Sequence, residues 1–321
     1  MTTQSPKVNV CIPVYNGSAY IADSIKSILN QTFEDFSVII SDNCSTDNTV
    51  EVVLGFNDPR IVLSENSENI GLVANFNRVL DLADAEYIVL WAHDDIMLAD
   101  NLRQKVHLLD KNPNVGIVHS DVLMIDDEGN QHDFQMFKDS KQDYIENGQT
   151  VFHRYIMNMP RGAMFFIGSV MARRECYQKL GGFNPRLPNT GDSELWMRIA
   201  LFYDVACISE PLVTYRHHQA MTSAANSESK GMNIQGFDEH YLCASVVIDN
   251  HKDRISERQN LRKQLTQAFA FQAIRMGSYY CNRNNFTLAK AFVMKAFNMH
   301  PQVIIKAVFW KVAKKLLLNQ K

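Results

Sequence analysis

Short apolar segments alternate with amphipathic ones over the first third of the chain. The apolar segments have the length and the β-branched composition of buried strands. They are residues 8–14 (VNVCIPV), 36–41 (FSVIIS), 60–63 (RIVL) and 87–91 (YIVLW). Between them, side chains such as Ile21, Ile25 and Ile28 recur every three or four residues, and residues 72–82 are similar, which predicts helices. Because strands and helices alternate, we expect an α/β domain with a mainly parallel sheet.

Acidic turns follow two of these predicted strands. Asp42 comes directly after residues 36–41, and Asp94-Asp95 follows residues 87–91. Ligands of open parallel sheets bind at the carboxyl ends of the strands. The two turns are therefore expected at one edge of the sheet, and that edge is the first candidate for a site.

The Asp94-Asp95 doublet has two readings. Adjacent carboxylates suit Mg²⁺ or Mn²⁺, which prefer oxygen ligands and often bind substrate phosphates as well. The doublet can equally be a cap or a solvated turn before a helix that we expect at residues 101–110. Asp42 has the same ambiguity between a ligand contact and a turn residue, whereas Thr46-Asp47 reads as a helix cap.

Composition and missing motifs exclude several protein classes. With 46% hydrophobic and 21% charged residues, the 321-residue chain is globular and not disordered. Neither G-x-G-x-x-G after the first strand nor a P-loop motif occurs, so these nucleotide-binding folds have no support. Six dispersed cysteines without a C-x-x-C pair indicate reduced thiols. The start MTTQSPK lacks signal-peptide features and no apolar run is long enough to span a membrane, so we expect a cytoplasmic protein.

The charges divide the chain unevenly. The net charge is −3, yet Glu257 is the last acidic residue, and the 12 Lys and Arg from Arg258 onward have no acidic counterpart. An acidic body with a basic end indicates two parts with different partners and does not fit a uniformly basic nucleic-acid binder. Residues 115–120 and 165–172 predict further strands, and the chain beyond residue 237 reads as helical.

Residues 303–318 (VIIKAVFWKVAKKLLL) predict a cationic amphipathic helix. Its apolar face consists of Ile305, Val308, Phe309, Val312 and Leu316, and its lysines are Lys306, Lys311, Lys314 and Lys315. Such a helix suits the boundary of an anionic membrane. The alternative is a helix that packs on the protein with its lysines toward solvent.

A series of motifs runs in order along the first part of the chain. It begins with VCIPVYNGSAYIADSIKSILNQTFEDFSVIISDNCSTDNT at residues 10–49. It continues with N-x-G at 69–71, W-A-H-D-D at 91–95, L-G-G-F-N-P at 180–185, G-D-S-E-L-W-M-R at 191–198 and Y-R-H-H at 215–218. Through this ordered series, residues 6–220 resemble family 2 glycosyltransferases.

The resemblance implies a fold, a reaction and a division of the chain. The fold would be GT-A, a Rossmann-like and mainly parallel sheet with a C-terminal α-helical extension. Residues 1–220 would be the catalytic domain, and residues 221–321 a helical region with a basic tail. The reaction would be inverting transfer of a sugar from a UDP- or dTDP-sugar to a hydroxyl of a glycan or lipid-linked acceptor in cell-surface polysaccharide synthesis. The expected location is cytoplasmic, peripheral on the inner face of the plasma membrane.

The resemblance also assigns a nucleotide site and a metal. The nucleotide-binding residues would be Pro13, Tyr15, Asn16, Asp42, Asn69 and Asp94, with the proline and the tyrosine flanking the base. Asp42 would accept a hydrogen bond from the imide nitrogen of uracil or thymine, and Asp94 would lie near the ribose and the diphosphate. Asp95 would bind the Mn²⁺ or Mg²⁺ that bridges the diphosphate. His218 would approach the diphosphate or the metal.

Asp192 would be the general base that takes the proton of the acceptor hydroxyl. Its alternative role is a cap for the helix expected at residues 193–202. Glu194 is either an acceptor contact or a first-turn charge.

Three positions depart from the family pattern. Ala92 replaces the outermost carboxylate of many relatives, Phe76 replaces an arginine that often precedes Asn77, and Gly191 replaces a glutamate before Asp192. These changes keep open a rival role as a catalytically weak binding or scaffold subunit. A second rival, a sugar-nucleotide nucleotidyltransferase, would need a Gly-rich phosphate loop after the first strand. The donor sugar, the acceptor, the linkage and the oligomeric state stay open.

Overall fold

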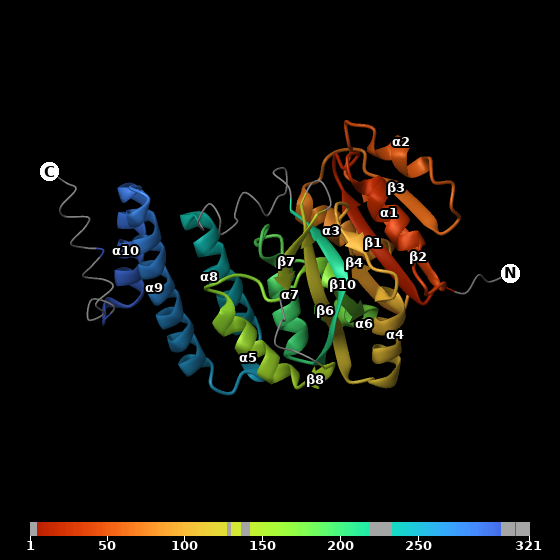
Figure 1. Cartoon of the computed structure of the whole chain (residues 1–321). Helices are drawn as coiled ribbons and strands as arrows, with labels where there is room; N and C mark the ends of the chain where they lie inside the picture. Colours follow the sequence, from red (N-terminus) through yellow and green to blue (C-terminus); the bar gives the residue numbers. More distant parts are fainter. Residues whose placement is uncertain (1–4, 127–129, 136–141, 218–232, 303–311, 313–321) are drawn as a thin grey trace. The chain divides into compact units, whose positions relative to one another are not determined.

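The computed structural model describes residues 5–126, 130–135, 142–217, 233–302 and 312, without the side chains of residues 131–135 (Figure 1). The chain divides into two compact units. The first consists of Met1–Phe152 and Phe165–His218, and the second of His153–Met164 and Gln219–Lys321. The expected catalytic domain at residues 1–220 and helical region at residues 221–321 stay predictions, because compactness alone assigns no role to either unit.

The described strands form one sheet of ten strands. They are β1 (Val8–Val14), β2 (Phe36–Asp42), β3 (Ile61–Glu65), β4 (Tyr87–Leu90), β5 (Ile96–Met97), β6 (Val115–Ile125), β7 (Gln131–Gln135), β8 (Tyr144–Glu146), β9 (Val170–Arg173) and β10 (Asp204–Arg216). Their order is β3-β2-β1-β4-β9-β6-β10-β5, with β7 paired to β6 and β8 to β10. Neighbours from β3 to β4 are parallel, as are β6 and β10, whereas β9 is antiparallel to β4 and β6. The predicted α/β fold with a mainly parallel sheet is confirmed.

Helices connect these strands (Figure 1). They are α1 (Ile21–Leu29), α2 (Thr49–Leu54), α3 (Leu72–Leu82), α4 (Asn101–Lys111), α5 (Gly148–Asn158), the 3₁₀ helix η1 (Ile167–Ser169), α6 (Arg174–Leu180) and α7 (Gly191–Ala200). The helices predicted at residues 72–82 and 101–110 are α3 and α4.

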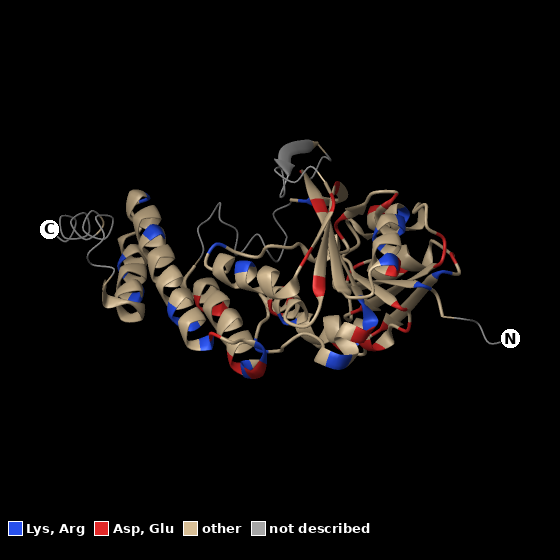
Figure 2. Ribbon diagram, turned by 90° about the horizontal axis from the view of Figure 1, so that it is seen from below, with Lys and Arg blue, Asp and Glu red and all other residues tan. Residues whose placement is uncertain are grey.

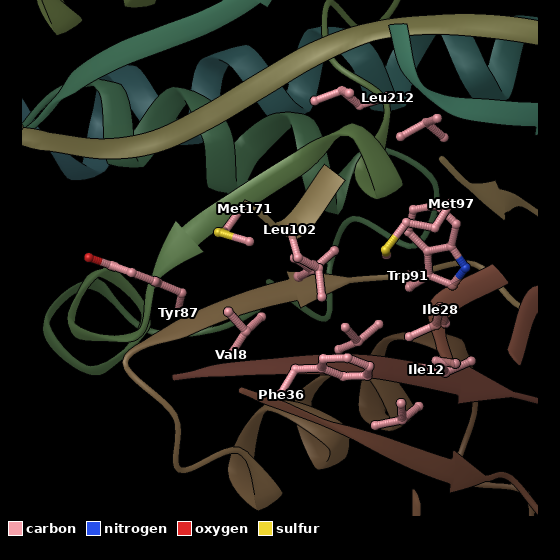
Figure 3. Packing of buried hydrophobic residues seen from close by; sticks show 14 of the residues in the cluster. Val8, Ile12, Ile28, Phe36, Tyr87, Trp91, Met97, Leu102, Met171 and Leu212 are labelled. Carbon is pink, nitrogen blue, oxygen red and sulfur yellow. The ribbon is translucent and has the colours of Figure 1, made fainter. Parts of the chain in front are cut away.

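The core of the first unit lies between one face of the sheet and the inner faces of α1 and α4 (Figure 3). Alternate side chains of β1 belong to it and are at most 2% exposed, namely Val8, Val10, Ile12 and Val14. Ile21, Ile25 and Ile28 of α1 are completely buried, as their spacing predicts. Trp91, just beyond β4, is also completely buried, and its indole N–H donates to the Ser24 hydroxyl at 2.8 Å. This packing fixes the ends of the strands that carry the acidic turns.

The register of the strands brings their carboxyl ends to one edge of the sheet. Asp42 at the end of β2 pairs with Val14 at the end of β1. On the other side of β1, Leu90 at the end of β4 pairs with Cys11. The chain beyond Leu90 therefore leaves the sheet near the level of Ile12, and both acidic turns lie at the same edge.

Residues 165–172 differ from the strand that the sequence predicts there. Ile167–Ser169 form η1, and β9 begins only at Val170. The Ser169 hydroxyl donates to the carbonyl oxygen of Phe166 at 2.7 Å, and the Ser169 N–H donates to the same oxygen at 3.0 Å. Such local hydrogen bonds compete with strand pairing. The chain consequently turns once before it enters the sheet.

The second unit is mainly helical in its described residues. Besides the later part of α5, its helices are α8 (Ile234–Asn250), the 3₁₀ helix η4 (Lys252–Arg254), α9 (Arg258–Asn282) and α10 (Phe286–Met299). The ring of Phe237 in α8 packs edge-on against Phe269 of α9 and Phe292 of α10, with centroid distances of 5.2 and 5.5 Å. The predicted C-terminal α-helical extension of the fold is confirmed in the described residues. No helix among the described residues is long and apolar enough to cross a membrane.

Most of the amphipathic helix predicted at residues 303–318 lies outside the described residues. Val312 is described, and it is helical and 2% exposed. Its side chain is therefore covered by protein, as the packing alternative expects at this position.

Candidate active site

Hydrogen bonds join two loops at the carboxyl edge of the sheet. One loop follows β1 and contains Asn16, whose φ of 52° lies in the left-handed region that asparagine tolerates better than most residues. The other loop follows β2. The N–H of Asn16 donates to the Ser45 hydroxyl, and Oδ1 of Asn16 accepts the N–H of Thr46, both at 2.8 Å. Asn16, a predicted nucleotide-binding residue, is thus part of the frame of this edge.

Asp47 strengthens the same connection. Its carboxylate accepts the N–H of Ser18 at 3.1 Å and both the N–H, at 3.0 Å, and the hydroxyl of Thr49. Burial acts to raise the pKa of Asp47, yet these hydrogen bonds lower it to about 2. Gly17 completes the contact, because a Cβ at this position would lie 2.6 Å from side-chain atoms of both His93 and Val14.

Asp42 is enclosed by these loops and is 2% exposed. Its Oδ2 accepts the N–H of Ser45 at 2.9 Å. Its Oδ1 is buried and has no hydrogen-bond partner among the described residues. A buried polar atom without a partner costs about 1–3 kcal/mol, and such atoms are rare in folded proteins. The arrangement therefore offers one acceptor to a ligand that brings a donor.

A cluster of asparagines closes the edge beside Asp42. Nδ2 of Asn43 donates to Oδ1 of Asn69 at 2.9 Å, and Oδ1 of Asn43 accepts Nδ2 of Asn66 at 3.1 Å and the N–H of Ile70 at 3.0 Å. Asn69 also accepts the N–H of Gly71, whose φ is 86°. Asn69 is exposed, so it can both shape this loop and face a ligand.

Apolar side chains near these loops can contact a nucleotide base. Tyr15 is 45% exposed immediately after β1, whereas Pro13, the other predicted base contact, is buried in β1 opposite Ser41. Ile70 and Leu72 are 40% and 46% exposed on the asparagine loop and the start of α3. Aromatic and aliphatic side chains of this kind suit the flat, apolar faces of a base.

Asp94 and Asp95 follow β4 at this edge. Asp95 is 3% exposed, and its Oδ1 accepts the N–H of Arg216 at 3.1 Å. Burial, together with the neighbouring charge of Asp94, raises the pKa of Asp95 above its usual range. Strand β5 separates the doublet from α4, which has Asp100 at its cap position. Asp95 is therefore neither a solvated turn residue nor the cap of that helix.

The Asp94-Asp95 doublet fits a divalent cation. Mg²⁺ and Mn²⁺ bind through one or two carboxylates and complete their coordination with water and phosphate oxygens. The described residues contain no group of three or more His, Cys, Asp or Glu side chains that could hold a metal, so a cation here would depend on such outside ligands. A cation beside Asp95 would also favour its charged form against burial. His218, the other predicted metal residue, lies outside the described residues.

Arg216 is a residue of this edge to which the sequence pattern assigns no role. It is 7% exposed, and its Nε donates to the carbonyl oxygen of Asp94 at 3.2 Å. Its guanidinium lies 5.3 Å from the ring centroid of Tyr20. The guanidinium places a positive charge beside the two carboxylates. The sequence feature that could have pointed to Arg216 is the Y-R-H-H motif at residues 215–218, in which the arginine ends β10.

Asp192 lies in the first turn of α7. Near the end of that helix, a Cβ on Gly116 of β6 would contact Ile199 and Tyr203. Helix α7 therefore packs against β6. Strand β9 pairs with both β4 and β6 in a register that puts Ile117 of β6 level with Ile88 of β4.

The local contacts of Asp192 bear on its alternative role as a cap of α7. Its Oδ1 accepts the N–H of Ser193 at 2.6 Å, and its side chain is half-buried. The cap position of α7 belongs to Thr190, where no side-chain capping hydrogen bond is present. Asp192 thus follows the cap position by two residues. Its role as the base stays a prediction.

Glu194 forms a buried ion pair with Arg198. Two hydrogen bonds of 3.0 and 2.8 Å join the guanidinium to the carboxylate, and Arg198 also donates to the carbonyl oxygens of Gly181 at 3.0 Å and Gly182 at 2.6 Å. The pair holds the L-G-G-F-N-P loop against α7. This structural role leaves Glu194 2% exposed and favours the first-turn charge over an acceptor contact.

Two of the departures from the family pattern meet at Phe183. The Phe76 ring lies 4.9 Å from the Phe183 ring between centroids, and a Cβ on Gly191 would lie 3.1 Å from Phe183. Asn77 holds the same residue by accepting its N–H at 2.7 Å and donating to its carbonyl oxygen at 3.0 Å. An aromatic contact and a close backbone approach therefore join the positions of Phe76 and Gly191.

Sequence comparison relates the chain to known proteins. Residues 9–180 match the family model described as "Glycosyl transferase family 2". An uncharacterized glycosyltransferase of Methanocaldococcus jannaschii is 30% identical over 216 residues, which are 66% of this chain and 71% of that protein. An uncharacterized glycosyltransferase of Rickettsia typhi is 26% identical over 222 residues, which are 69% of this chain and 67% of that protein.

Solved structures share the fold at low sequence identity. Residues 1–349 of Staphylococcus aureus TarS, in complex with UDP-GlcNAc, superpose with a TM-score of 0.62 at 18% identity, covering 92% of this chain and 89% of that one. The mannosyltransferase PcManGT of Pyrobaculum calidifontis, in complex with GDP-Man and Mn²⁺, gives a TM-score of 0.57 at 19% identity, covering 99% and 89%. The predicted GT-A fold is confirmed by these similarities.

Proposed function

Because the chain belongs to glycosyl transferase family 2, we propose that it moves a sugar from a nucleoside diphosphate donor to a hydroxyl of a glycan or lipid-linked acceptor in cell-surface polysaccharide synthesis. The observation that carries this proposal is the buried Oδ1 of Asp42, which lacks a partner among the described residues. Asp94 and Asp95 lie at the same edge of the sheet. A nucleotide base can supply the missing donor, while its diphosphate can share a metal with the two carboxylates.

The geometry of Asp42 favours uracil or thymine as the base. The imide of these bases has a single N–H, which matches the single acceptor that Oδ1 leaves open. Guanine instead presents two adjacent donors, its ring N–H and its amino group, which would need two free carboxylate oxygens. Oδ2 of Asp42 already accepts the N–H of Ser45. The donor is therefore a UDP- or dTDP-sugar in this proposal. The similar structures were solved with UDP-GlcNAc in one case and GDP-Man in the other.

Asp94 and Asp95 are the proposed contacts of the diphosphate and its Mn²⁺ or Mg²⁺. Such a cation would stabilise the negative charge that develops on the leaving diphosphate. Asp95→Ala removes the buried ligand without adding volume, and it should abolish the manganese-dependent part of UDP binding in calorimetry. Equal UDP affinity in manganese and in chelator would show that the metal assignment is wrong.

Asp192 is the proposed general base. A carboxylate at the start of α7 can orient the acceptor hydroxyl and accept its proton as the bond to the sugar forms. Attack on the face opposite the leaving diphosphate inverts the anomeric centre. The catalytically weak alternative predicts normal nucleotide binding without this turnover.

The basic tail is one proposed membrane contact, on the strength of its charge pattern. Trp310 in this segment allows a direct test, because Trp91 and Trp196 are at most 1% exposed and are inaccessible to lipid. If the tail inserts, brominated lipids in anionic vesicles should quench the fluorescence of Trp310. Unquenched Trp310 in vesicle-bound protein would favour the packing alternative, which the burial of Val312 already supports at one position.

A ligand screen tests the proposed function. A compound that binds only the folded state raises Tm. With Mn²⁺ present, UDP- or dTDP-sugars should raise Tm of the full chain, and ADP-sugars should not, because the Watson–Crick ring nitrogen of adenine is an acceptor and not a donor. No shift with any nucleotide sugar would refute donor binding.

A further inference from the structure

Three large apolar side chains are exposed on the paired helices α9 and α10. Phe271, Met294 and Phe297 are 38%, 52% and 41% exposed. The Phe271 ring lies 6.4 Å from the His300 ring between centroids. Phe297 and Met294 are three residues apart in the last turns of α10, which ends at Met299 just before His300, so they share one flank of that helix. We call these three residues, with Arg275 and Lys290, the α9–α10 surface.

The charges of this surface have a single sign. Figure 2 shows Lys and Arg, and no Asp or Glu, along α9 and α10. Arg275 is exposed one turn after Phe271, and Lys290 is exposed one turn before Met294. Neither has an ion-pair partner among the described residues. By contrast, other cations of these helices pair with acidic residues of α8, as Arg262 does with Asp249 and Lys295 with Asp238.

The combination of exposed rings and unpaired cations restricts what can cover the surface. A second copy that used the same face in a two-fold dimer would bring the cations of one copy toward those of the other, and like charges oppose such contacts. An anionic bilayer meets both features, since its headgroups attract the cations and its acyl boundary accepts the rings.

We propose that the α9–α10 surface binds an anionic lipid membrane. This contact does not depend on residues 303–318, and the burial of Val312 shows that at least one predicted membrane-facing residue of that tail is covered by protein. It is also independent of sugar transfer. The surface would hold the protein at a bilayer whether or not a nucleotide is bound.

Flotation of the full chain with vesicles of phosphatidylglycerol and phosphatidylcholine tests the proposal. Combined Phe271→Gln, Met294→Gln and Phe297→Gln should lower the vesicle partition coefficient by about tenfold or more, because a bilayer contact of this kind depends on buried apolar area. Leu54→Gln with Val62→Gln is the matched control, since these side chains are 64% and 52% exposed in the first unit. The control should bind as the wild type does.

Charge reversal and fluorescence give independent readings. Arg275→Glu with Lys290→Glu should weaken binding at low salt, and added salt should weaken wild-type binding. Phe297→Trp in a Trp310→Phe background should be quenched by brominated lipid. Full vesicle binding by the triple glutamine variant, or an unquenched tryptophan in vesicle-bound protein, would overturn the proposal. So would wild-type dimers that the triple variant converts to monomers.

Discussion

The substitution Asp42→Asn, in which an NH₂ group replaces one carboxylate oxygen, should change which base the protein prefers. In the wild type, Oδ2 accepts the N–H of Ser45 and Oδ1 is open to a ligand donor. In Asp42→Asn the remaining oxygen keeps the Ser45 contact, so the new NH₂ group faces the ligand. The N–H of uracil would then meet a donor, whereas the N3 atom of cytosine is an acceptor. We expect weaker UDP binding and stronger CDP binding.

The magnitude follows from the charge and the burial of the site. A hydrogen bond to a charged group contributes about 1.5–3 kcal/mol, and 1.4 kcal/mol is tenfold in affinity. UDP affinity should therefore fall roughly ten- to a hundredfold. The ratio of UDP to CDP affinity should change more, because the same substitution provides a new hydrogen bond to cytosine.

Calorimetry with Mn²⁺ and UDP or CDP measures both affinities. Asp47→Asn is the matched control, because Asp47 is a carboxylate of the same loop whose oxygens are taken by Ser18 and Thr49. The control should lose stability and keep its preference for UDP. An unchanged UDP-to-CDP ratio in Asp42→Asn would refute the role of Asp42 in base recognition.

Three further substitutions test other parts of the structure. Asp192→Asn should lower kcat by about a hundredfold or more with little change in donor affinity, and near-normal turnover would contradict its role as the base. Lys105 of α4 is completely buried, its Nζ has no hydrogen-bond partner among the described residues, and burial lowers its pKa to about 7. Because the lysine of the unfolded chain keeps its proton up to about pH 10, the stability of the wild type should rise between pH 7 and 10. In thermal melts, Lys105→Met should have a higher Tm than the wild type at pH 7 and should lack this rise. Asp47, with its pKa of about 2, stabilises the fold above about pH 4 and loses this effect as the pH falls toward 2. The Tm of Asp47→Asn should therefore be lower than that of the wild type at pH 7 and similar to it near pH 2.

The sequence predicts the elements whose burial follows a simple period. Alternate apolar residues in β1 and the three- to four-residue spacing in α1 both face the core, because one buried face imposes that period. The edge of the sheet that carries Asp42 and Asp95 was also predictable. Parallel strands necessarily present their carboxyl ends together, and both residues directly follow such strands.

The details of the site depend on contacts between distant segments and were not predictable. Arg216 reaches Asp94 and Asp95 only because β10 ends beside the turn after β4. Nothing in the sequence indicates which oxygen of Asp42 stays open. The i to i+4 spacing of Glu194 and Arg198 was visible, but their burial against the loop at Gly181 depends on how α6 and α7 pack.

The most direct test of sugar transfer is proton NMR of the anomeric signals while the full chain, with Mn²⁺, consumes the nucleotide sugar that the screen selects. Water can replace the unknown acceptor in a slow reaction. We predict release of nucleoside diphosphate and first appearance of the free sugar in the inverted configuration, with neither product formed by Asp192→Asn. Release of nucleoside monophosphate and sugar phosphate would instead indicate chemistry at the diphosphate bond. Binding of the donor without any consumption, even with a panel of glycan acceptors, would indicate a binding subunit and contradict the account.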